Sequence, residues 1–242
     1  MNNPLYPQDK PQFGNRMTVI GHFFELRSRL IKCIIPLILF SIVSYFFFEK
    51  ILELLKKPYP HNLVFVTPLE PFNAVLEVSI FGGIVLSLPV ILFQLWKFVA
   101  PGLNEKERKY AIVYIPAGII LFLTGLLFCY YIFLPIGLKF LLGFGTNVFQ
   151  PMVSVSSYLS FVLVMALVFG VTFELPLAAV ILTKLGIVNY RFLSQNRRIA
   201  IVIIFIIGGI ITPGPDIFSQ FSVAIPLLIL YEASVWLSKL TK

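Results

Sequence analysis

The feature that most constrains this chain is a series of long apolar stretches that contain no charged side chain. Three of them, residues 33–48, 78–96 and 110–138, have a charged residue at each end. An α-helix needs about 20 apolar residues to cross roughly 30 Å of hydrocarbon. Charged residues make up only 12% of the chain, against about 25% in soluble domains. The sequence therefore predicts an all-α polytopic membrane protein.

Three further spans follow. Residues 140–173 carry no charge, but Gly, Asn, Gln and Pro between 143 and 151 indicate a loop, so the fourth span is expected from about Ser157 to Thr183. The last two are residues 199–211 and 218–236, separated by the turn T-P-G-P-D. A 13-residue helix rises about 20 Å, so the fifth span is short for a bilayer of about 30 Å.

The distribution of basic residues predicts the orientation. Six spans place both termini on one side, and fifteen of the 19 Lys and Arg residues fall on that side. Basic residues favour the cytoplasmic side of a bacterial membrane, or the stroma or matrix of an organelle. We expect a bacterial inner membrane, with thylakoid and mitochondrial inner membranes as alternatives. The positive charge thus relates to the lipid bilayer, and no nucleic-acid partner is expected.

The domain organisation is predicted to be simple. Residues 1–20 form a flexible polar arm, 21–238 a single six-helix domain and 239–242 a short tail. The first long apolar stretch begins only at Cys33, so no cleavable signal peptide is expected. Every long span contains a proline: Pro36, Pro89, Pro116, Pro176 and Pro226. Proline removes a backbone donor, so we expect bent helices that form a concave, open scaffold, although transmembrane helices also simply tolerate proline.

Several chemistries are disfavoured by the composition. Two cysteines and two histidines offer little for a disulfide scaffold or a metal site, and the cysteines are expected at opposite membrane faces as packing residues. No phosphate-binding loop, dinucleotide fingerprint, zinc-protease motif or catalytic triad is evident. We therefore expect no enzyme, no cofactor and no metal.

Two acidic residues stand in otherwise basic segments. Glu25 precedes the first span in H-F-F-E-L-R-S-R, and Glu107 lies in the loop N-E-K-E-R-K. Glu25 has two interpretations: an intrahelical ion pair with Arg29 four residues later, or a side chain that faces away from Arg29 and receives a cation from a partner. Glu107 is either part of a solvated loop or a second acid at the same interface. Two carboxylates there suit a pair of guanidinium groups.

Glu174 is a carboxylate inside the fourth span, where facing lipid would cost several kcal/mol. Ala166 and Gly170 lie on nearly the same helix face and would let another helix approach closely. Pro176 frees a carbonyl nearby, so one interpretation is a protonated acid bonded to that carbonyl. The alternatives are a contact with a partner helix and a proton site.

The chain resembles the TatC family, the six-span core subunit of the twin-arginine protein translocase, from roughly Gly21 to Ser238. The resemblance rests on ordered blocks: H-F-F-E-L-R-S-R at 22–29, P-V-I-L-F-Q-L-W-K-F-V-A-P-G-L at 89–103, E-K-E-R-K at 105–109, S-Y-L-S-F-V at 157–162, F-G-V-T-F-E-L-P at 169–176 and T-P-G-P-D-I-F-S-Q at 212–220.

The resemblance implies a receptor for paired-arginine signal peptides of folded proteins, acting in proton-motive-force-driven export with single-span TatA/TatB-type subunits and in a self-associating complex. It assigns signal binding to Glu25 and Glu107, with the surrounding surface shaped by Leu26, Arg27, Phe98 and Pro101. Glu174 becomes a partner site. Two further positions, Pro58 and Asp216, become structural or partner-associated.

Two other functions remain open from the residues. A proton-coupled small-molecule permease would use Glu174 as its proton carrier, but such a protein often shows an internal repeat, and none is visible here. A membrane assembly factor without a transport role would need no acids on the basic face.

Overall fold

The computed structural model describes residues 19–59, 62–100, 111–143, 152–211 and 217–240. Regular structure within these ranges is helical apart from one isolated bridge between Val64 and Ser154, which confirms the all-α prediction. In chain order the elements are α1 (Val19–Tyr45), α2 (Phe48–Lys56), α3 (Glu70–Val99), α5 (Ala111–Phe128), the π-helix η2 (Cys129–Phe133), α6 (Leu134–Gly143), α7 (Val155–Phe173), α8 (Leu175–Lys184), α9 (Tyr190–Gln195), α10 (Arg197–Ile211) and α11 (Ile217–Leu240).

Four helical segments in the described ranges are long and apolar enough to cross a membrane: Glu70–Val99, Ile112–Gly143, Val155–Lys184 and Gln220–Leu240. The pair α1 and α2 qualifies as a fifth only as one bent unit. Helix α10 has 15 residues, in keeping with the short fifth span expected from the sequence. The count of six spans stays a prediction.

The first span differs from the predicted range 33–48. Its helix α1 starts at Val19, inside the predicted arm 1–20, and ends at Tyr45. The chain then turns by 80° into α2, which the sequence analysis did not foresee. Helix α2 carries Glu49, Lys50, Glu53 and Lys56 among apolar residues. Charges at this spacing are costly in hydrocarbon, so the helix leaves the direction of the span.

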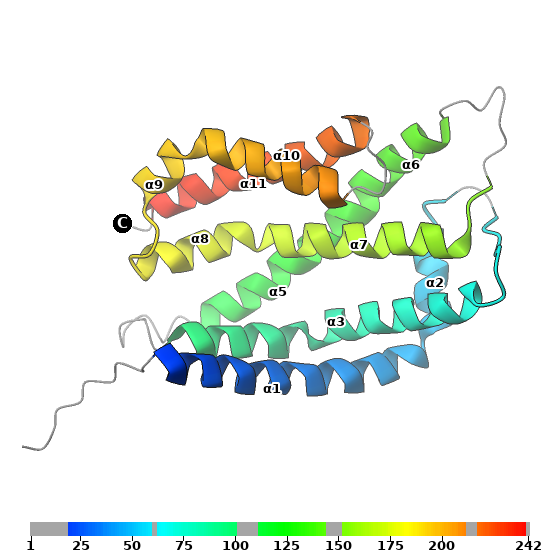
Figure 1. Ribbon diagram of the computed structural model, residues 1–242, viewed down its shortest axis with the longest axis horizontal. Helices are drawn as coiled ribbons and strands as arrows, with labels where there is room; N and C mark the ends of the chain where they lie inside the picture. Colours follow the sequence, from blue (N-terminus) through cyan, green and yellow to red (C-terminus); the bar gives the residue numbers. More distant parts are fainter. Residues whose placement is uncertain (1–18, 60–61, 101–110, 144–151, 212–216, 241–242) are drawn as a thin grey trace, which may run out of the picture.

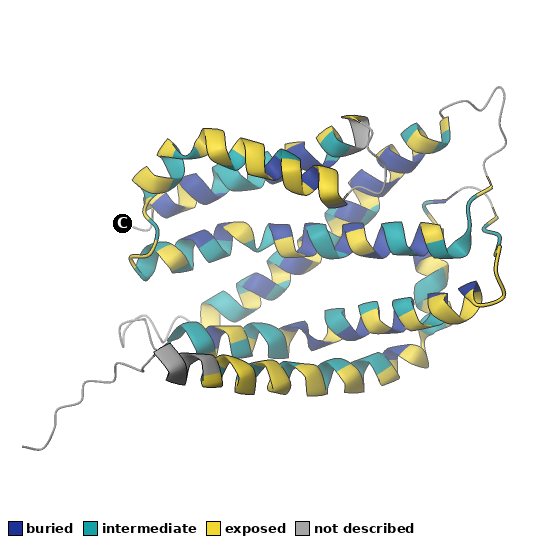
Figure 2. Ribbon diagram, viewed as in Figure 1, coloured by how far each residue is buried: buried dark blue, intermediate teal, exposed yellow. Residues whose placement is uncertain are grey.

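Helices α1 and α3 lie side by side along most of their length (Figure 1). Small residues allow the close approach. A Cβ atom on Gly83 would lie 2.8 Å from the Cα of Ser41, and one on Gly82 would overlap the Ser44 hydroxyl. Such small-residue contacts are typical of helix packing in membranes, where lipid is as apolar as the side chains. The outward face of α1 is largely exposed, as expected of a lipid-facing helix (Figure 2).

The segment from α5 to α6 crosses obliquely past α7 (Figure 1). A Cβ on Gly125 would lie 2.6 Å from the Phe169 carbonyl oxygen, and one on Gly170 would lie 2.7 Å from the Phe122 ring. The stripe of Ala166 and Gly170 is therefore occupied by the chain's own α5. The prediction that this stripe lets another helix approach closely is thus confirmed at Gly170, where the neighbouring helix is α5.

The five prolines of the predicted spans lie in two kinds of position. Pro36, Pro89, Pro116 and Pro226 lie inside continuous helices, and only Pro176 stands beside a helix break, at Glu174. The π-helix η2 interrupts the third predicted span without a proline in it. Both cysteines, Cys33 and Cys129, are free thiols, as predicted.

Candidate functional site

The predicted signal-binding residues that the structure describes lie at one end of the molecule. Glu25, Leu26 and Arg27 are near the start of α1, and Phe98 is near the end of α3. These two helix ends are adjacent in Figure 1. Three other predicted residues, Pro101, Glu107 and Asp216, fall outside the described residues.

Glu25 forms an ion pair with Arg29 on the same helix. The Arg29 Nε donates to Glu25 Oε1 at 3.1 Å, and its Nη2 contacts the same oxygen. The two side chains are 17–18% exposed. The intrahelical interpretation is therefore confirmed, and the interpretation in which Glu25 faces away from Arg29 is wrong. A pair of this kind stabilises a helix by only about 0.3–0.5 kcal/mol.

The surface around this pair is apolar and basic. Phe24 is 65% exposed and Leu26 45%, while Arg27 is also exposed. Exposed apolar side chains next to a basic residue suit the boundary between headgroups and acyl chains. An apolar segment of a ligand would find complementary side chains here, and a cationic group would need Glu25 as its partner.

The second site centres on Glu174, the residue at which α7 ends and α8 begins. Its amide donates to the Val171 carbonyl at 3.1 Å, a tighter turn than the α-helical pattern. Pro176 is in the first turn of α8 and has no N–H, so it donates no bond back to the end of α7. The helix break and the acidic side chain therefore lie at the same residue.

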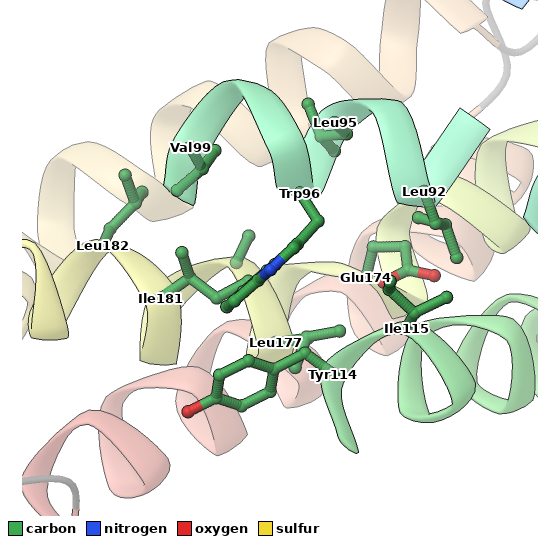
Figure 3. A pocket seen from close by; sticks show the side chains of 11 residues that line it. Leu92, Leu95, Trp96, Val99, Tyr114, Ile115, Glu174, Leu177, Ile181 and Leu182 are labelled. Carbon is green, nitrogen blue, oxygen red and sulfur yellow. The ribbon is translucent and has the colours of Figure 1, made fainter. Parts of the chain in front are cut away.

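Glu174 borders a cavity of 230 Å³ between α3, α5 and α8. Figure 3 shows its carboxylate between Leu92 and Ile115, at one end of the cavity. The rings of Trp96 and Tyr114, with centroids 5.1 Å apart, form part of the wall. The other lining residues are apolar: Leu95, Val99, Leu177, Ala178, Ile181 and Leu182. Glu174 is the single ionisable carboxylate among these lining residues.

The Glu174 carboxylate packs against the backbone of α5. A Cβ on Gly118 would lie 3.2–3.3 Å from its two oxygens, so the glycine leaves room for the acid. Oε1 is buried and has no hydrogen-bond partner among the described residues. The expected bond to a carbonyl freed by Pro176 is therefore not made by this oxygen. A charged oxygen without a donor is unfavourable at such a position, so the arrangement suits a bound proton or a donor from another molecule.

Two other acids in the helices, Glu232 and Glu77, have partners on neighbouring helices. Glu232 accepts from Arg197 at 2.5 Å, which links α11 to α10. Glu77, expected at the outer interface, accepts from the Ser160 hydroxyl at 3.1 and 3.2 Å and links α3 to α7. No group of three His, Cys, Asp or Glu side chains in the described ranges could hold a metal ion.

The structure adds information on two positions, Gly118, which the sequence did not indicate, and Pro58, which it did. Gly118 has no motif that marks it, because its role depends on a contact between residues 56 positions apart in the chain. Pro58 follows α2 and lines a separate cavity with Lys57 and Lys139.

Comparisons with known proteins agree with this architecture. Residues 21–226 match the family model described as Sec-independent protein translocase protein (TatC). A relative with that name from Carboxydothermus hydrogenoformans is 40% identical over 97% of this chain and 96% of its own length. One from Aquifex aeolicus is 40% identical over 93% and 95%. A crystal structure of the twin arginine translocase receptor TatC superposes with a TM-score of 0.82 at 40% identity, covering 91% of this chain and 99% of that one.

Proposed function

Because this chain belongs to the TatC family, we propose that it recognises paired-arginine signal peptides of folded proteins. It is a membrane-embedded component of the twin-arginine protein translocase and a transport receptor rather than an enzyme. Its relatives are translocase proteins, and nothing in the comparisons supports the permease alternative.

We place the proposed receptor in a bacterial inner membrane with six spans and both termini in the cytoplasm. The basic inner segments support this orientation, since fifteen of the 19 Lys and Arg residues would face the cytoplasm. The start of α1 and the end of α11 lie at the same end of the molecule in Figure 1, as this orientation needs.

The observation that carries the proposal is the Glu25–Arg29 pair at the exposed end of α1. In the proposed mechanism an arginine of the signal peptide replaces Arg29 as the partner of Glu25. The exchange replaces one guanidinium with another, so the carboxylate keeps a charge-assisted partner before and after the peptide binds. Arg29 thus keeps the acid neutralised until a peptide arrives.

Glu107 is proposed to receive the second arginine, with Pro101 directing the loop that carries it. Two adjacent arginines then meet two carboxylates, each able to accept two charge-assisted hydrogen bonds. Exposed Leu26 and half-buried Phe98 would contact the apolar part of the peptide, and Arg27 would discourage further positive charge.

Glu174 is proposed to act after signal binding. A polar side chain of a single-span TatA/TatB-type subunit would supply the donor that Oε1 does not find among the described residues, in a step of the export driven by the proton-motive force. Asp216 and self-association of this chain would contribute to the assembled complex.

The proposal is tested by photocrosslinking from Leu26 and from Phe98 to a paired-arginine signal peptide on a folded cargo. The control is a crosslinker at Phe46, which is 77% exposed and lies at the other end of α1. Crosslinks from Leu26 and Phe98 but not from Phe46 are expected. Equal crosslinking from all three positions, or none from Leu26 and Phe98, would contradict the proposed binding surface.

A further inference from the structure

A cavity at the opposite end of the molecule brings two lysines together. It has a volume of 370 Å³ and lies between the end of α2 and helix α6, both at the right in Figure 1. Lys57 and Lys139 line it. The remaining lining residues are Pro58, Pro135, Leu138, Leu142 and Gly143, none of which is charged. The cavity is therefore cationic at two points and apolar along its walls.

The end of α2 is held in place by two tyrosines from other elements. The Tyr130 hydroxyl donates to the Leu54 carbonyl at 2.9 Å, and the Tyr158 hydroxyl donates to the Leu55 carbonyl at 2.7 Å. Tyr158 is only 2% exposed, and its ring packs on that of Tyr59 at 5.2 Å. The segment that presents Lys57 and Pro58 is thus anchored on both sides.

These hydrogen bonds also change the electrostatics of the helix end. A helix C-terminus carries partial negative charge on its unpaired carbonyls and would repel an anion. Here the Leu54 and Leu55 carbonyls of the last turn accept hydrogen bonds from tyrosines, and the Leu54 carbonyl also accepts from the Lys57 amide at 3.3 Å. Burial raises the pKa of the Tyr59 phenol, so that neighbour also stays neutral.

No carboxylate offsets the two lysines inside the cavity. Neither Lys57 nor Lys139 forms an ion pair with a described residue. The adjoining segments 60–61 and 144–151 contain no Asp or Glu in their sequence. Glu53 lies one turn before Lys57 on α2, but it does not line the cavity and makes no ion pair with Lys57. Among the described residues that line the cavity, an anion would therefore meet two positive charges and no carboxylate.

We propose that this cavity binds the headgroup of an anionic phospholipid, with Lys57 and Lys139 on the headgroup and the proline and leucine side chains along the first part of an acyl chain. The apolar walls favour a lipid over free phosphate, because a small anion would lose hydration against them and gain only two flexible ammonium groups. On the proposed orientation the lipid belongs to the outer leaflet. The site is separate from the proposed signal-binding residues, and its test does not depend on them.

The test uses the full chain purified in detergent and mixed with equal amounts of phosphatidylglycerol and phosphatidylcholine, with bound lipid counted by native mass spectrometry. Each basic side chain near a membrane surface contributes about a fivefold preference for anionic lipid. Lys57→Gln and Lys139→Gln should each lower phosphatidylglycerol retention about fivefold, and the double variant about 25-fold. Lys50→Gln is the matched control, since Lys50 is on the same helix but does not line the cavity.

Each outcome decides the proposal. Selective loss in the two cavity variants, with Lys50→Gln unchanged and Lys57→Arg near the wild-type level, supports it. Equal loss with Lys50→Gln would show general attraction of anionic lipid, and wild-type retention in the double variant would leave the cavity without a role; either result overturns the proposal. Displacement of phosphatidylglycerol by millimolar inorganic phosphate would also overturn it, in favour of a free-anion site.

Discussion

Two carboxylates in this protein, Glu25 and Glu174, have opposite environments. Glu25 lies at the end of a helix and is neutralised by Arg29 one turn away. Glu174 lies at a helix break beside an apolar cavity, and its Oε1 has no hydrogen-bond partner among the described residues. A ligand that binds Glu25 must replace the Arg29 guanidinium. A ligand that binds Glu174 could supply the hydrogen-bond donor that Oε1 does not have among the described residues.

The difference separates two roles. An intrahelical pair near water is weak, so exchange with an incoming arginine is inexpensive and the site can bind and release. An acid without a donor in a low-dielectric region is unfavourable when charged, so its state depends strongly on a proton or a partner. We infer that Glu25 selects the signal peptide and that Glu174 responds to the partner subunit that assembles later.

The largest effect is expected for Glu25→Ala on signal binding. Removing one side of a buried arginine–carboxylate pair costs about 3–5 kcal/mol, which partial exposure reduces here to about 2 kcal/mol, or about thirtyfold in affinity. Affinity for a paired-arginine peptide, measured by fluorescence anisotropy in detergent, should fall by that factor, and Glu107→Ala should behave alike. Glu53→Ala on α2 is the control. Wild-type affinity in both acid variants would remove the proposed docking site.

The next effect is expected for Glu174→Ala on transport. Loss of a charge-assisted contact with a partner subunit should reduce cargo export about tenfold in membrane vesicles. Signal-peptide affinity should stay within twofold of wild type, because the junction of α7 and α8, where the acid lies, is away from the start of α1 (Figure 1). A drop in signal affinity equal to that of Glu25→Ala would merge the two roles and contradict the comparison.

A smaller effect is expected for Glu174→Met on stability. An unsatisfied buried polar atom costs about 1–3 kcal/mol, and an apolar side chain of similar length fits the cavity wall. The midpoint of thermal unfolding in detergent should rise by about 2–4 °C. Gly118→Ala is the opposite probe, since its methyl group would crowd the carboxylate and should lower the midpoint. A lower midpoint for Glu174→Met would indicate that the acid has a stabilising partner.

The smallest effect is expected for Arg29→Ala. The resident partner of Glu25 is lost, so an incoming arginine no longer competes with it, and signal affinity should be unchanged or rise by up to about twofold. Arg27→Ala, which removes an adjacent charge that does not pair with Glu25, is the comparison. A fall as large as that of Glu25→Ala would show that Arg29 itself contacts the peptide.

Much of the fold follows from the position of charges along the chain. The apolar stretches between charged residues located helices α3, α10 and α11. They also located the two spans that are built from more than one helix, α5 to α6 and α7 to α8. The reason is that a charged side chain inside hydrocarbon is costly. The short fifth helix and the free cysteines were also predicted. The resemblance to the family supplied the proposed roles of the site residues, which local chemistry alone left open.

The remaining features depend on contacts between distant residues. The direction of α2 depends on tyrosines from η2 and α7, which lie 76 and 103 positions away in the chain respectively. The Ala166 and Gly170 stripe marked a close helix contact correctly, but spacing does not reveal whether the neighbour is α5 or another subunit. For Glu25, the distance to Arg29 along the helix was the better guide, and the expectation of an outward-facing acid was wrong.

The most direct test of the account is whether the receptor distinguishes guanidinium from ammonium. Affinities of a paired-arginine signal peptide and its paired-lysine counterpart are compared on the wild-type chain and on Glu25→Ala. The account predicts that the wild type binds the arginine peptide at least tenfold more tightly, since only a guanidinium can form the bidentate bonds, and that Glu25→Ala loses most of this preference. Equal affinity for both peptides on the wild type, or an undiminished preference in Glu25→Ala, would contradict it.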